Sequence, residues 1–355
     1  MESQTDSEMR IHPFFSYNGF QGSEADWTSF ISSGIEQAPE WEQPFLLFIR
    51  EWLNDNTELE VQTSGSTGAA KAWKVPKLAM VNSATLTANY FNCKEETTAL
   101  LCLPGNFIAG KMMLVRAMTF GWSLKVIKPS TTPLAEIEEP FDFAAFTPMQ
   151  VASLNDRMLG LLSRFGVGIL GGAAVSEMLR KRLSEFCNNL YETYGMAETL
   201  SHIAVRKITL EETPFHALDG IVLSVDEVGR LRIHAPHIQA DVIQTNDVVE
   251  LFGKSSFFYK GRYDRMINSG GVKLFAEVIE RKLESMIHVP FAIGAVHDEM
   301  LGQRVVLYLE ANSNIDKERL RDSMKLTLDR FEVPKEIRFL DKLERTESGK
   351  IKIIR

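Results

Sequence analysis

Cysteine is scarce in this sequence, and its scarcity limits the compartments and sites that are compatible with it. Only three cysteines occur among 355 residues, at Cys93, Cys102 and Cys187. Their number is odd and they form no C-x-x-C pair, which argues against a disulfide framework and against a structural zinc site. We therefore expect a reducing compartment, namely the cytoplasm.

Long apolar runs and an excess of basic residues are also missing. No apolar stretch approaches about 18 residues, and the N-terminal segment MESQTDSEMR is polar and acidic where a signal peptide would be basic and then apolar. Lysine and arginine number 39 against 47 aspartates and glutamates, which gives a formal net charge of −8. We therefore expect no membrane span and no nucleic-acid partner, and any anionic ligand has to be bound by local groups.

The composition that remains is that of a globular protein. Hydrophobic residues make up 45% of the chain and charged residues 24%, and a length of 355 residues favours two domains. From about 58 to 195, β-like runs alternate with helical runs at 77–91, 110–120 and 176–186, which predicts an α/β class with a mainly parallel sheet. A small β region follows at 200–260, with a hairpin connection at 226–229, and two further helices are expected at 276–287 and 317–331. We expect a larger N-terminal α/β domain at 1–263 and a small, mobile C-terminal α+β domain at 264–355.

The stretch TSGSTGAAK at 63–71 follows a short β-prone run. Its glycines allow close approach of the backbone to a ligand, and its hydroxyls, amides and lysine favour an anion such as phosphate. The common phosphate loop G-x-x-x-x-G-K-[ST] does not fit, because Ala70 lies five residues after Gly65 and Ala72 follows Lys71. A different phosphate loop and a flexible Gly/Ser-rich linker are both open readings of this stretch.

Several later stretches combine glycines with polar or aromatic residues. The glycines of GGAAV follow the apolar run VGIL, at the end of a predicted strand, where open α/β sheets bind ligands. The carboxylate of Glu198 suits a magnesium ion that bridges phosphate oxygens, although a solvated loop glutamate is the common alternative. The stretches are GGAAV at 171–175, YETYGMAETL at 191–200, QTNDVV at 244–249, GRYDRMINSGG at 261–271 and RTESGK at 345–350.

Taken together and in this order, these motifs resemble those of the adenylate-forming superfamily, which includes acyl- and aryl-CoA synthetases, luciferases and nonribosomal-peptide adenylation domains. The resemblance spans residues 63–351. Within the superfamily the chain is most similar to a short 2-succinylbenzoate–CoA ligase of menaquinone biosynthesis, because it lacks most of the long N-terminal subdomain of ordinary acyl-CoA synthetases. The resemblance implies ATP, Mg²⁺, coenzyme A and a small carboxylic acid as ligands. It also implies AMP-forming chemistry, which needs positioning and charge stabilisation but no protein nucleophile.

The resemblance also assigns roles to residues. The β- and γ-phosphates would be held by Thr63, Ser64, Gly65, Ser66, Thr67, Gly68 and Lys71. The adenine would be lined by Gly171, Gly172 and Ala173 and stacked on by Tyr194, with Gly195 and Met196 beside it. Glu198 would bind Mg²⁺, and Asp247 and Arg262 would bind the ribose hydroxyls. Lys350 would assist adenylation as a catalytic residue, and Asp264 would be the hinge of domain rotation. The tunnel for coenzyme A would be lined by Ser269, Gly270 and Gly271.

Three positions depart from the family pattern, and the first is Ala70, where proline usually precedes the lysine of the loop. Phe107 occupies a slot that is histidine-like in the family, and Ala197 replaces the threonine of YG-x-T-E, whose hydroxyl Thr199 would then supply. 2-Succinylbenzoate keeps one free carboxylate and therefore needs a cation and an apolar wall. The acid-site candidates are Phe107, Gly110, Lys111, Arg116 and His202.

Three functions stay open at this level. One is the CoA ligase. Another is an adenylation enzyme that activates a different aryl or acyl acid, or that loads the acid onto a carrier protein in place of free coenzyme A. The third is a degenerate protein that binds nucleotide without turnover, which the changes at Phe107 and Ala197 favour and the presence of Lys71, Glu198 and Lys350 disfavours. The oligomeric state is not readable from the sequence.

Overall fold

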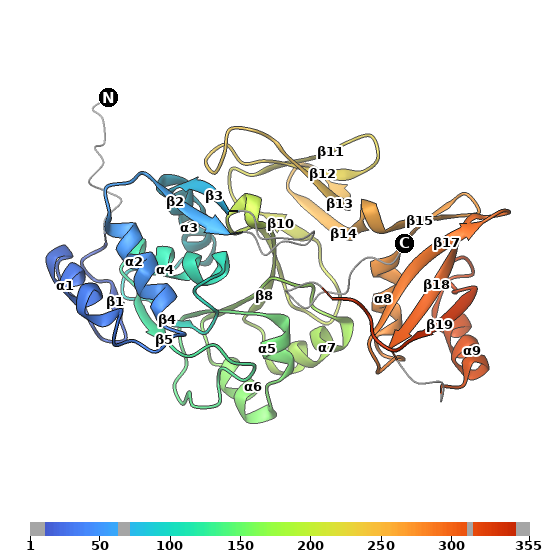
Figure 1. Cartoon of the computed structure of the whole chain (residues 1–355), viewed down its shortest axis with the longest axis horizontal. Helices are drawn as coiled ribbons and strands as arrows, with labels where there is room; N and C mark the ends of the chain where they lie inside the picture. Colours follow the sequence, from blue (N-terminus) through green and yellow to red (C-terminus); the bar gives the residue numbers. More distant parts are fainter. Residues whose placement is uncertain (1–10, 63–71, 311–314, 346–355) are drawn as a thin grey trace.

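The computed structural model describes residues 11–62, 72–310 and 315–345, and it confirms the predicted α/β class. Figure 1 shows a large body built around one long sheet and, at its right-hand end, a small body with a sheet of its own. The turn η3 at Tyr263–Arg265 joins the last strand of the large sheet to the first strand of the small one. The domain boundary at Asp264 stays a prediction, which this change of sheet supports.

The parallel half of the large sheet carries the predicted βαβ pattern. Its order is β1, β5, β4, β6, β7, β8, and all neighbouring strands in it are parallel. In that order the strands are Ser16–Tyr17, Ser123–Val126, Thr98–Leu101, Phe143–Phe146, Val167–Leu170 and Leu190–Gly195. The carboxyl ends of these strands therefore lie along one edge, which is where ligand-binding loops are expected.

Alternate residues of the parallel strands enter two separate cores on opposite faces of the sheet. Ala99 and Leu101 of β4 pack in one core, and Leu100 with Cys102 in the other. The first face is covered by α1 (Glu24–Gly34), α2 (Gln43–Leu53), α3 (Lys77–Phe91) and α4 (Ile108–Phe120). The second is covered by α5 (Pro148–Ala152), α6 (Asp156–Leu162) and α7 (Glu177–Phe186).

The predicted helices at 77–91, 110–120 and 176–186 are confirmed as α3, α4 and α7. The sequence pattern did not predict α1, α2, α5 or α6. The last two span only five and seven residues, which is too short for a helical period to repeat clearly.

The β-rich region at 200–260 is confirmed, but it continues the large sheet and does not form a sheet of its own. From β8 onward the order is β9, β10, β14, β13, β12, β11, and every pairing is antiparallel. In that order the strands are His202–Lys207, Phe215–Ala217, Ser256–Arg262, Ile243–Phe252, Arg230–His234 and Val222–Val225. The predicted connection at 226–229 joins β11 to β12, and Asp226 stabilises it by accepting hydrogen bonds from the amides of Val228 and Arg230.

A short antiparallel pair supports the glycine-rich segment. The strands β2 (Glu58–Gln62) and β3 (Ala72–Pro76) pair so that Gln62 lies opposite Ala72. The two residues that flank 63–71 are therefore held side by side, and the nine-residue segment connects the ends of a closed ladder.

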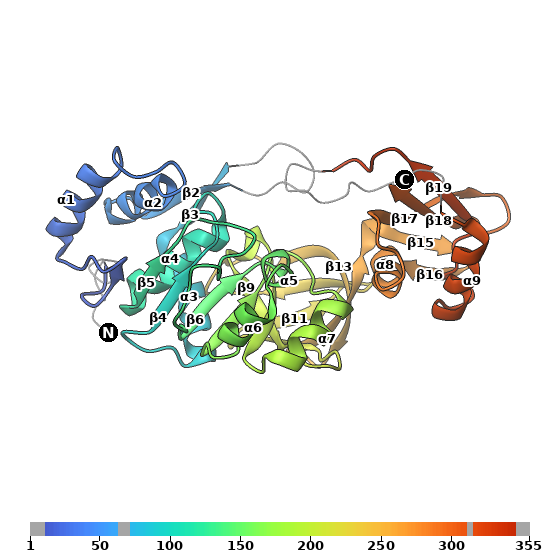
Figure 2. The same cartoon turned by 90° about the horizontal axis from the view of Figure 1, so that it is seen from below.

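The small body has its own sheet and its own core. Its strands are β15 (Met266–Ser269), β16 (Val272–Phe275), β17 (Phe291–Asp298), β18 (Gly302–Glu310) and β19 (Glu336–Leu340). Its helices are α8 (Ala276–Leu283) and α9 (Lys317–Thr327), each about four residues shorter than the sequence pattern predicts. Helix α9 ends because Leu328 turns to an extended conformation. Figure 2 shows this body at the opposite end of the molecule from α1.

In the ranges that the structure covers, none of the helices has both the length and the apolar character needed to cross a bilayer.

Candidate active site

Two of the predicted site segments lie outside the described residues. These are the phosphate-loop candidates at 63–71 and the catalytic candidate Lys350. Their roles stay predictions. The described candidates for the nucleotide site lie in the turn after β7, at the end of β8 and in the turn that follows it, within β13, and at the end of β14.

Gly171 lies directly after β7, at the carboxyl edge of the sheet. Its amide donates to the carbonyl of Phe146 at 3.0 Å, and a Cβ atom at this position would lie only 2.7 Å from Oγ1 of Thr193. The next residue, Gly172, has φ +84°, a conformation that L side chains rarely adopt. Glycine at 172 thus provides the backbone conformation that this turn needs. The predicted adenine-lining residues, including Ala173, lie at the expected edge, and their contact with adenine stays a prediction.

Tyr194, near the end of β8, reaches across the sheet to β13. Its hydroxyl donates to Oδ2 of Asp247 at 2.6 Å, and its ring packs edge-on against Phe257 with centroids 5.0 Å apart. Burial, reinforced by the Asp247 carboxylate, raises the pKa of Tyr194 well above its ordinary value, so the hydroxyl remains a proton donor. The structure therefore brings the predicted adenine residue and one predicted ribose residue into direct contact.

The second ribose candidate, Arg262, lies opposite Asp247 in the β13–β14 ladder. Its Nε and Nη2 atoms donate to the two carboxylate oxygens of Asp264, each at 2.9 Å. This bidentate bond to Asp264 raises the pKa of Arg262, which stays charged. Tyr194, Asp247, Arg262 and the predicted hinge Asp264 thus form one continuous group at the junction of the two bodies.

Glu198 lies in the short turn η2 at Ala197–Thr199, and its side chain is exposed. Gly195 and Met196 precede it. Glycine is required at 195, because a Cβ there would lie 2.4 Å from the carbonyl oxygen of Ser201. An exposed carboxylate at the carboxyl edge of the sheet is available to a magnesium ion that carries phosphate oxygens.

The expectation that Thr199 replaces the hydroxyl missing at Ala197 is wrong. Thr199 is fully buried, and its Oγ1 accepts from the amide of Met196 at 2.9 Å. The same hydroxyl faces the carbonyl oxygens of Met196 and Ser201 at 3.0 and 2.7 Å. The turn therefore directs this hydroxyl into its own backbone, where no ligand reaches it.

The acid-site candidates at the start of α4 differ in their environment. Phe107 is the residue before the helix and is 49% exposed. Glycine is required at 110, because a Cβ would lie 2.4 Å from the carbonyl oxygen of Pro104. The Nζ atom of Lys111 lies 5.5 Å above the ring of Phe48 on α2, and burial lowers the pKa of this lysine. Lys111 therefore contacts α2.

Arg116, one and a half turns further along α4, is only 2% exposed. Its Nη2 atom donates to Oγ of Ser201 at 2.7 Å, its Nη1 lies 3.8 Å from Sδ of Met113, and its Nε has no hydrogen-bond partner. No carboxylate in the described ranges forms an ion pair with it. Burial lowers the pKa of Arg116 to about 10, so the guanidinium is still charged at neutral pH.

His202 is joined to Arg116 through Ser201, whose Oγ lies 3.3 Å from Nδ1 of His202. Burial, followed by the charge of Arg116, lowers the pKa of His202 well below its ordinary value. His202 is therefore a neutral ring at pH 7, and it cannot supply the cation that the sequence suggested for it. The sequence pattern did not single out Ser201, whose contact with Arg116 spans 85 positions.

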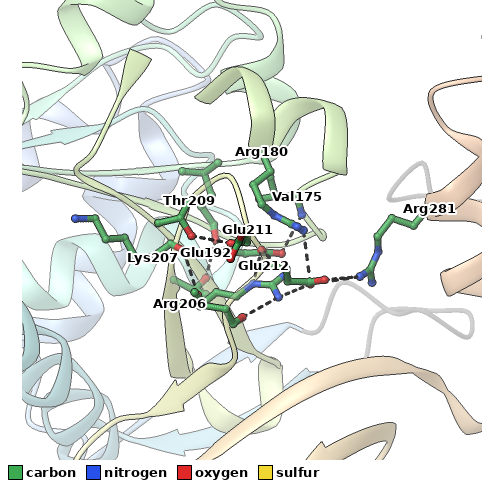
Figure 3. A network of polar contacts seen from close by, with 12 residues as sticks. Val175, Arg180, Glu192, Arg206, Lys207, Thr209, Glu211, Glu212 and Arg281 are labelled. Atoms are coloured by element: carbon green, nitrogen blue, oxygen red, sulfur yellow. Dashed lines mark hydrogen bonds and ion pairs between the residues drawn. The ribbon is translucent and has the colours of Figure 1, made fainter. Parts of the chain in front are cut away.

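A second polar cluster links the large body to the small one (Figure 3). The buried Arg206 of β9 pairs with Glu192 of β8 at 2.7 Å and with Glu212. Glu212 also meets Arg180 of α7 at 3.6 Å and Arg281 of α8 at 3.3 Å. Burial alone would raise the pKa of Glu212, but Arg206 and Arg281 hold that pKa below its ordinary value. Sequence reasoning missed this cluster, because its members come from unrelated elements.

The predicted coenzyme A tunnel residues form the hairpin between β15 and β16. Ser269 pairs with Val272, and Gly270 and Gly271 have φ +59° and +80°. A two-residue connection with both φ values positive requires glycine or asparagine-like residues and matches the twist of the strands. The tunnel itself stays a prediction.

Comparison with known protein families gives two matches in the expected order. A family described as AMP-binding enzyme matches residues 61–235, and its C-terminal domain matches residues 291–350. The second match begins after α8, at the first residue of β17.

Individual relatives agree with these matches. A solved structure of an acyl-CoA synthetase (AMP-forming)/AMP-acid ligase II-like protein from Dyadobacter fermentans is 33% identical, covers 89% of this chain and 95% of its own, and has a TM-score of 0.61. The o-succinylbenzoate CoA synthetase MenE from Bacillus subtilis, in complex with the acyl-adenylate intermediate OSB-AMP, has a TM-score of 0.72 at 18% identity, with 85% and 72% of the two chains covered.

Curated relatives include the 2-succinylbenzoate–CoA ligases of Staphylococcus epidermidis and Bacillus licheniformis. They are 24% and 25% identical over 81% and 84% of this chain, which correspond to 67% and 69% of their own lengths. The chain thus spans about two thirds of these relatives.

Proposed function

The chain belongs to the AMP-binding enzyme family, and we propose that it activates an aromatic dicarboxylic acid, 2-succinylbenzoate, for transfer to coenzyme A. As a member of this family it is an AMP-forming CoA ligase that uses ATP with magnesium. The substrate carboxylate attacks the α-phosphorus of ATP and releases pyrophosphate. The thiol of coenzyme A then displaces AMP from the acyl-adenylate and forms the thioester.

The observation that carries the choice of acid is the buried guanidinium of Arg116. A buried cation is costly unless an anion or several acceptors compensate it, and in the described ranges Arg116 has one strong acceptor and an unpartnered Nε atom. 2-Succinylbenzoate offers what is missing, because one of its carboxylates remains charged while the other is activated. The names of the curated relatives support the same acid.

We propose the following roles for the chain's own residues. Asp247, oriented by the Tyr194 hydroxyl, accepts from the ribose hydroxyls, and Arg262 lies beside it. Glu198 would hold the magnesium ion, which neutralises charge on the phosphate oxygens. Lys350 and the segment 63–71, outside the described residues, keep the roles that their motifs predict.

The three cysteines support a reducing compartment such as the cytoplasm. Cys93, Cys102 and Cys187 are all free thiols, and burial raises the pKa of each. Cys102 and Cys187 are buried and Cys93 is half-buried, and neutral thiols in such surroundings are poorly reactive, which fits a structural role.

Nucleotide binding without turnover is the second candidate function. The burial of the Thr199 hydroxyl favours it, because the hydroxyl absent at Ala197 is then not replaced. One missing neutral hydrogen bond is worth about 0.5 to 1.5 kcal/mol, which slows a reaction without abolishing it. We therefore place the ligase first.

The test is a product analysis with purified protein, Mg-ATP, coenzyme A and 2-succinylbenzoate. We expect AMP, pyrophosphate and a thioester in equal amounts by chromatography and mass spectrometry. Omission of coenzyme A should leave the acyl-adenylate bound. A parallel panel contains 4-oxo-4-phenylbutanoate, which lacks the carboxylate on the ring, together with benzoate and a fatty acid.

Each alternative has its own outcome in this assay. AMP formed only with monocarboxylic acids contradicts the proposed substrate and leaves the family assignment intact. Adenylate formation that coenzyme A does not discharge indicates a carrier protein as acceptor. Tight ATP binding without pyrophosphate release for any acid indicates the binding protein.

A further inference from the structure

Four polar side chains, of which Arg116, His202 and Thr87 are buried and Ser201 is half-buried, form a continuous hydrogen-bonded series that ends at Arg116. Arg116 Nη2 and Ser201 Oγ are 2.7 Å apart, and Ser201 Oγ is 3.3 Å from His202 Nδ1. On its other side His202 Nε2 is 3.3 Å from Oγ1 of Thr87, which is 3.4 Å from the carbonyl oxygen of Ser83. The series joins α4, the first residues of β9 and α3.

The chemistry of the groups allows one direction that runs continuously through this series. A guanidinium only donates, so Ser201 Oγ accepts from Arg116 and directs its own hydrogen to Nδ1 of His202. A neutral imidazole that accepts at Nδ1 carries its hydrogen on Nε2, and it donates that hydrogen to Thr87. Thr87 in turn donates to the backbone carbonyl of Ser83, one helical turn earlier. In this direction, each residue of the series donates a hydrogen to the next one along it.

We propose that Ser201, His202 and Thr87 are positioning residues that hold the Arg116 guanidinium for the second carboxylate of the acid, and that they thereby set the preference for dicarboxylic over monocarboxylic substrates. This inference rests on the proposed function. It goes beyond it by assigning the selectivity to residues that do not touch the substrate.

The surroundings of Arg116 explain why it needs such support. Its other described polar contact is the weak one to Met113 Sδ at 3.8 Å, so Ser201 is the strong hydrogen bond that fixes the plane of the guanidinium. A bidentate bond to a carboxylate requires the guanidinium to be held within about 0.5 Å and 10–20° of the productive geometry. In this arrangement Nδ1 of His202 accepts the hydrogen of Ser201, so a lone pair of Ser201 Oγ faces Arg116. Oγ1 of Thr87 accepts the hydrogen on Nε2, which fixes the tautomer of His202.

The test uses Thr87→Val, which removes the hydroxyl and keeps the shape. We expect KM for 2-succinylbenzoate to rise about three- to tenfold, as for the loss of one hydrogen bond, while kcat, KM for ATP and the kinetics with 4-oxo-4-phenylbutanoate stay as in the wild type. Thr87→Ser should restore the wild-type ratio. The matched control is Thr85→Val, because Thr85 also sits on α3 and bonds a carbonyl one turn earlier, that of Val81 at 2.9 Å.

A second measurement does not depend on any substrate. Long-range ¹⁵N–¹H NMR at pH 7 should find His202 neutral with its hydrogen on Nε2, with the signal assigned through its loss in His202→Gln. A hydrogen on Nδ1, or a charged ring, overturns the series.

The outcomes separate the two proposals. A wild type that adenylates only monocarboxylic acids overturns both the proposed substrate and this inference. A dicarboxylate preference that Thr87→Val leaves intact overturns this inference alone. A rise in KM that is equal for both acids, or that also appears in Thr85→Val, assigns Thr87 to general packing and overturns it as well.

Discussion

Glu212 and Arg281 join the two bodies of the protein across the predicted hinge. Both carboxylate oxygens of Glu212 lie within 3.4 Å of Nη1 of Arg281, which belongs to α8, 69 residues further along the chain. Arg206 and Arg180 hold Glu212 from the other side, so the carboxylate remains paired in the large body even if α8 moves away.

Arg281→Ala should therefore loosen the contact between the bodies at little cost to either fold. A partly exposed ion pair contributes up to about 1 kcal/mol, so amide hydrogen exchange at 263–266 should become up to about fivefold faster, and high salt should produce the same change in the wild type. The matched control is Lys282→Ala, because Lys282 pairs with Asp329 and Glu332 inside the small body. Equal exchange in all three proteins would mean that the pair does not restrain the hinge.

Tyr194→Phe should weaken ATP binding. The change keeps the ring but removes the 2.6 Å bond to Asp247, whose carboxylate then loses a fixed donor. A hydrogen bond to a charged group is worth about 1.5 to 3 kcal/mol, so the Kd for ATP should rise at least tenfold in calorimetry. Tyr191→Phe, three residues earlier on β8, should bind ATP like the wild type. An unaltered Kd in Tyr194→Phe would remove Asp247 from the ribose site.

Glu198→Gln should raise the magnesium concentration needed for adenylation by about tenfold, because the amide keeps the shape and loses the charge that a hard cation prefers. The exposed Glu185 on α7 provides the comparison, since Glu185→Gln makes the same change away from the turn η2. Identical magnesium titrations for both variants and the wild type would make Glu198 an ordinary loop residue.

Lys350→Ala should affect the two half-reactions unequally. If the lysine acts only on the transferring group, adenylate formation should slow by roughly 10² to 10³, as for the loss of one oxyanion-type donor, whereas thioester formation from supplied acyl-adenylate should change little. Lys352→Ala, which removes the same charge two residues later, should leave both rates near those of the wild type. Equal losses in both half-reactions would reject Lys350 as the adenylation catalyst.

His202 should make the fold sensitive to acid. Burial and Arg116 lower its pKa in the folded chain below the 6.5 of an ordinary histidine, so below pH 6.5 the unfolded chain binds more protons and stability falls as the pH drops. Between pH 7.5 and 5.5 this group should remove at most about 1.4 kcal/mol from the free energy of unfolding measured in urea. His202→Gln should lack that loss, and the exposed His288→Gln should retain it. The same pH dependence in all three proteins would contradict the neutral buried ring.

Local sequence predicted the elements that make up the site better than it predicted their contacts. The strand VGIL and the glycines after it were expected, and Gly171 indeed follows β7, where a Cβ would lie 2.7 Å from the side-chain hydroxyl oxygen of Thr193. The Thr199 expectation failed because a hydroxyl near a motif was assumed to face the ligand. The direction of that side chain is decided by the turn η2, which places it in contact with its own backbone.

The sequence by itself determined the class, the order of the strands along the chain and the positions that require glycine, because these depend on hydrophobic periodicity and on backbone conformation within a few residues. Only the tertiary structure decided which side chains meet. Thr87 and His202 are 115 residues apart, and they touch because α3 packs on the face of the sheet where β9 begins. Such contacts depend on strand order, register and helix packing, which arise from the whole core and leave no signal in any local stretch.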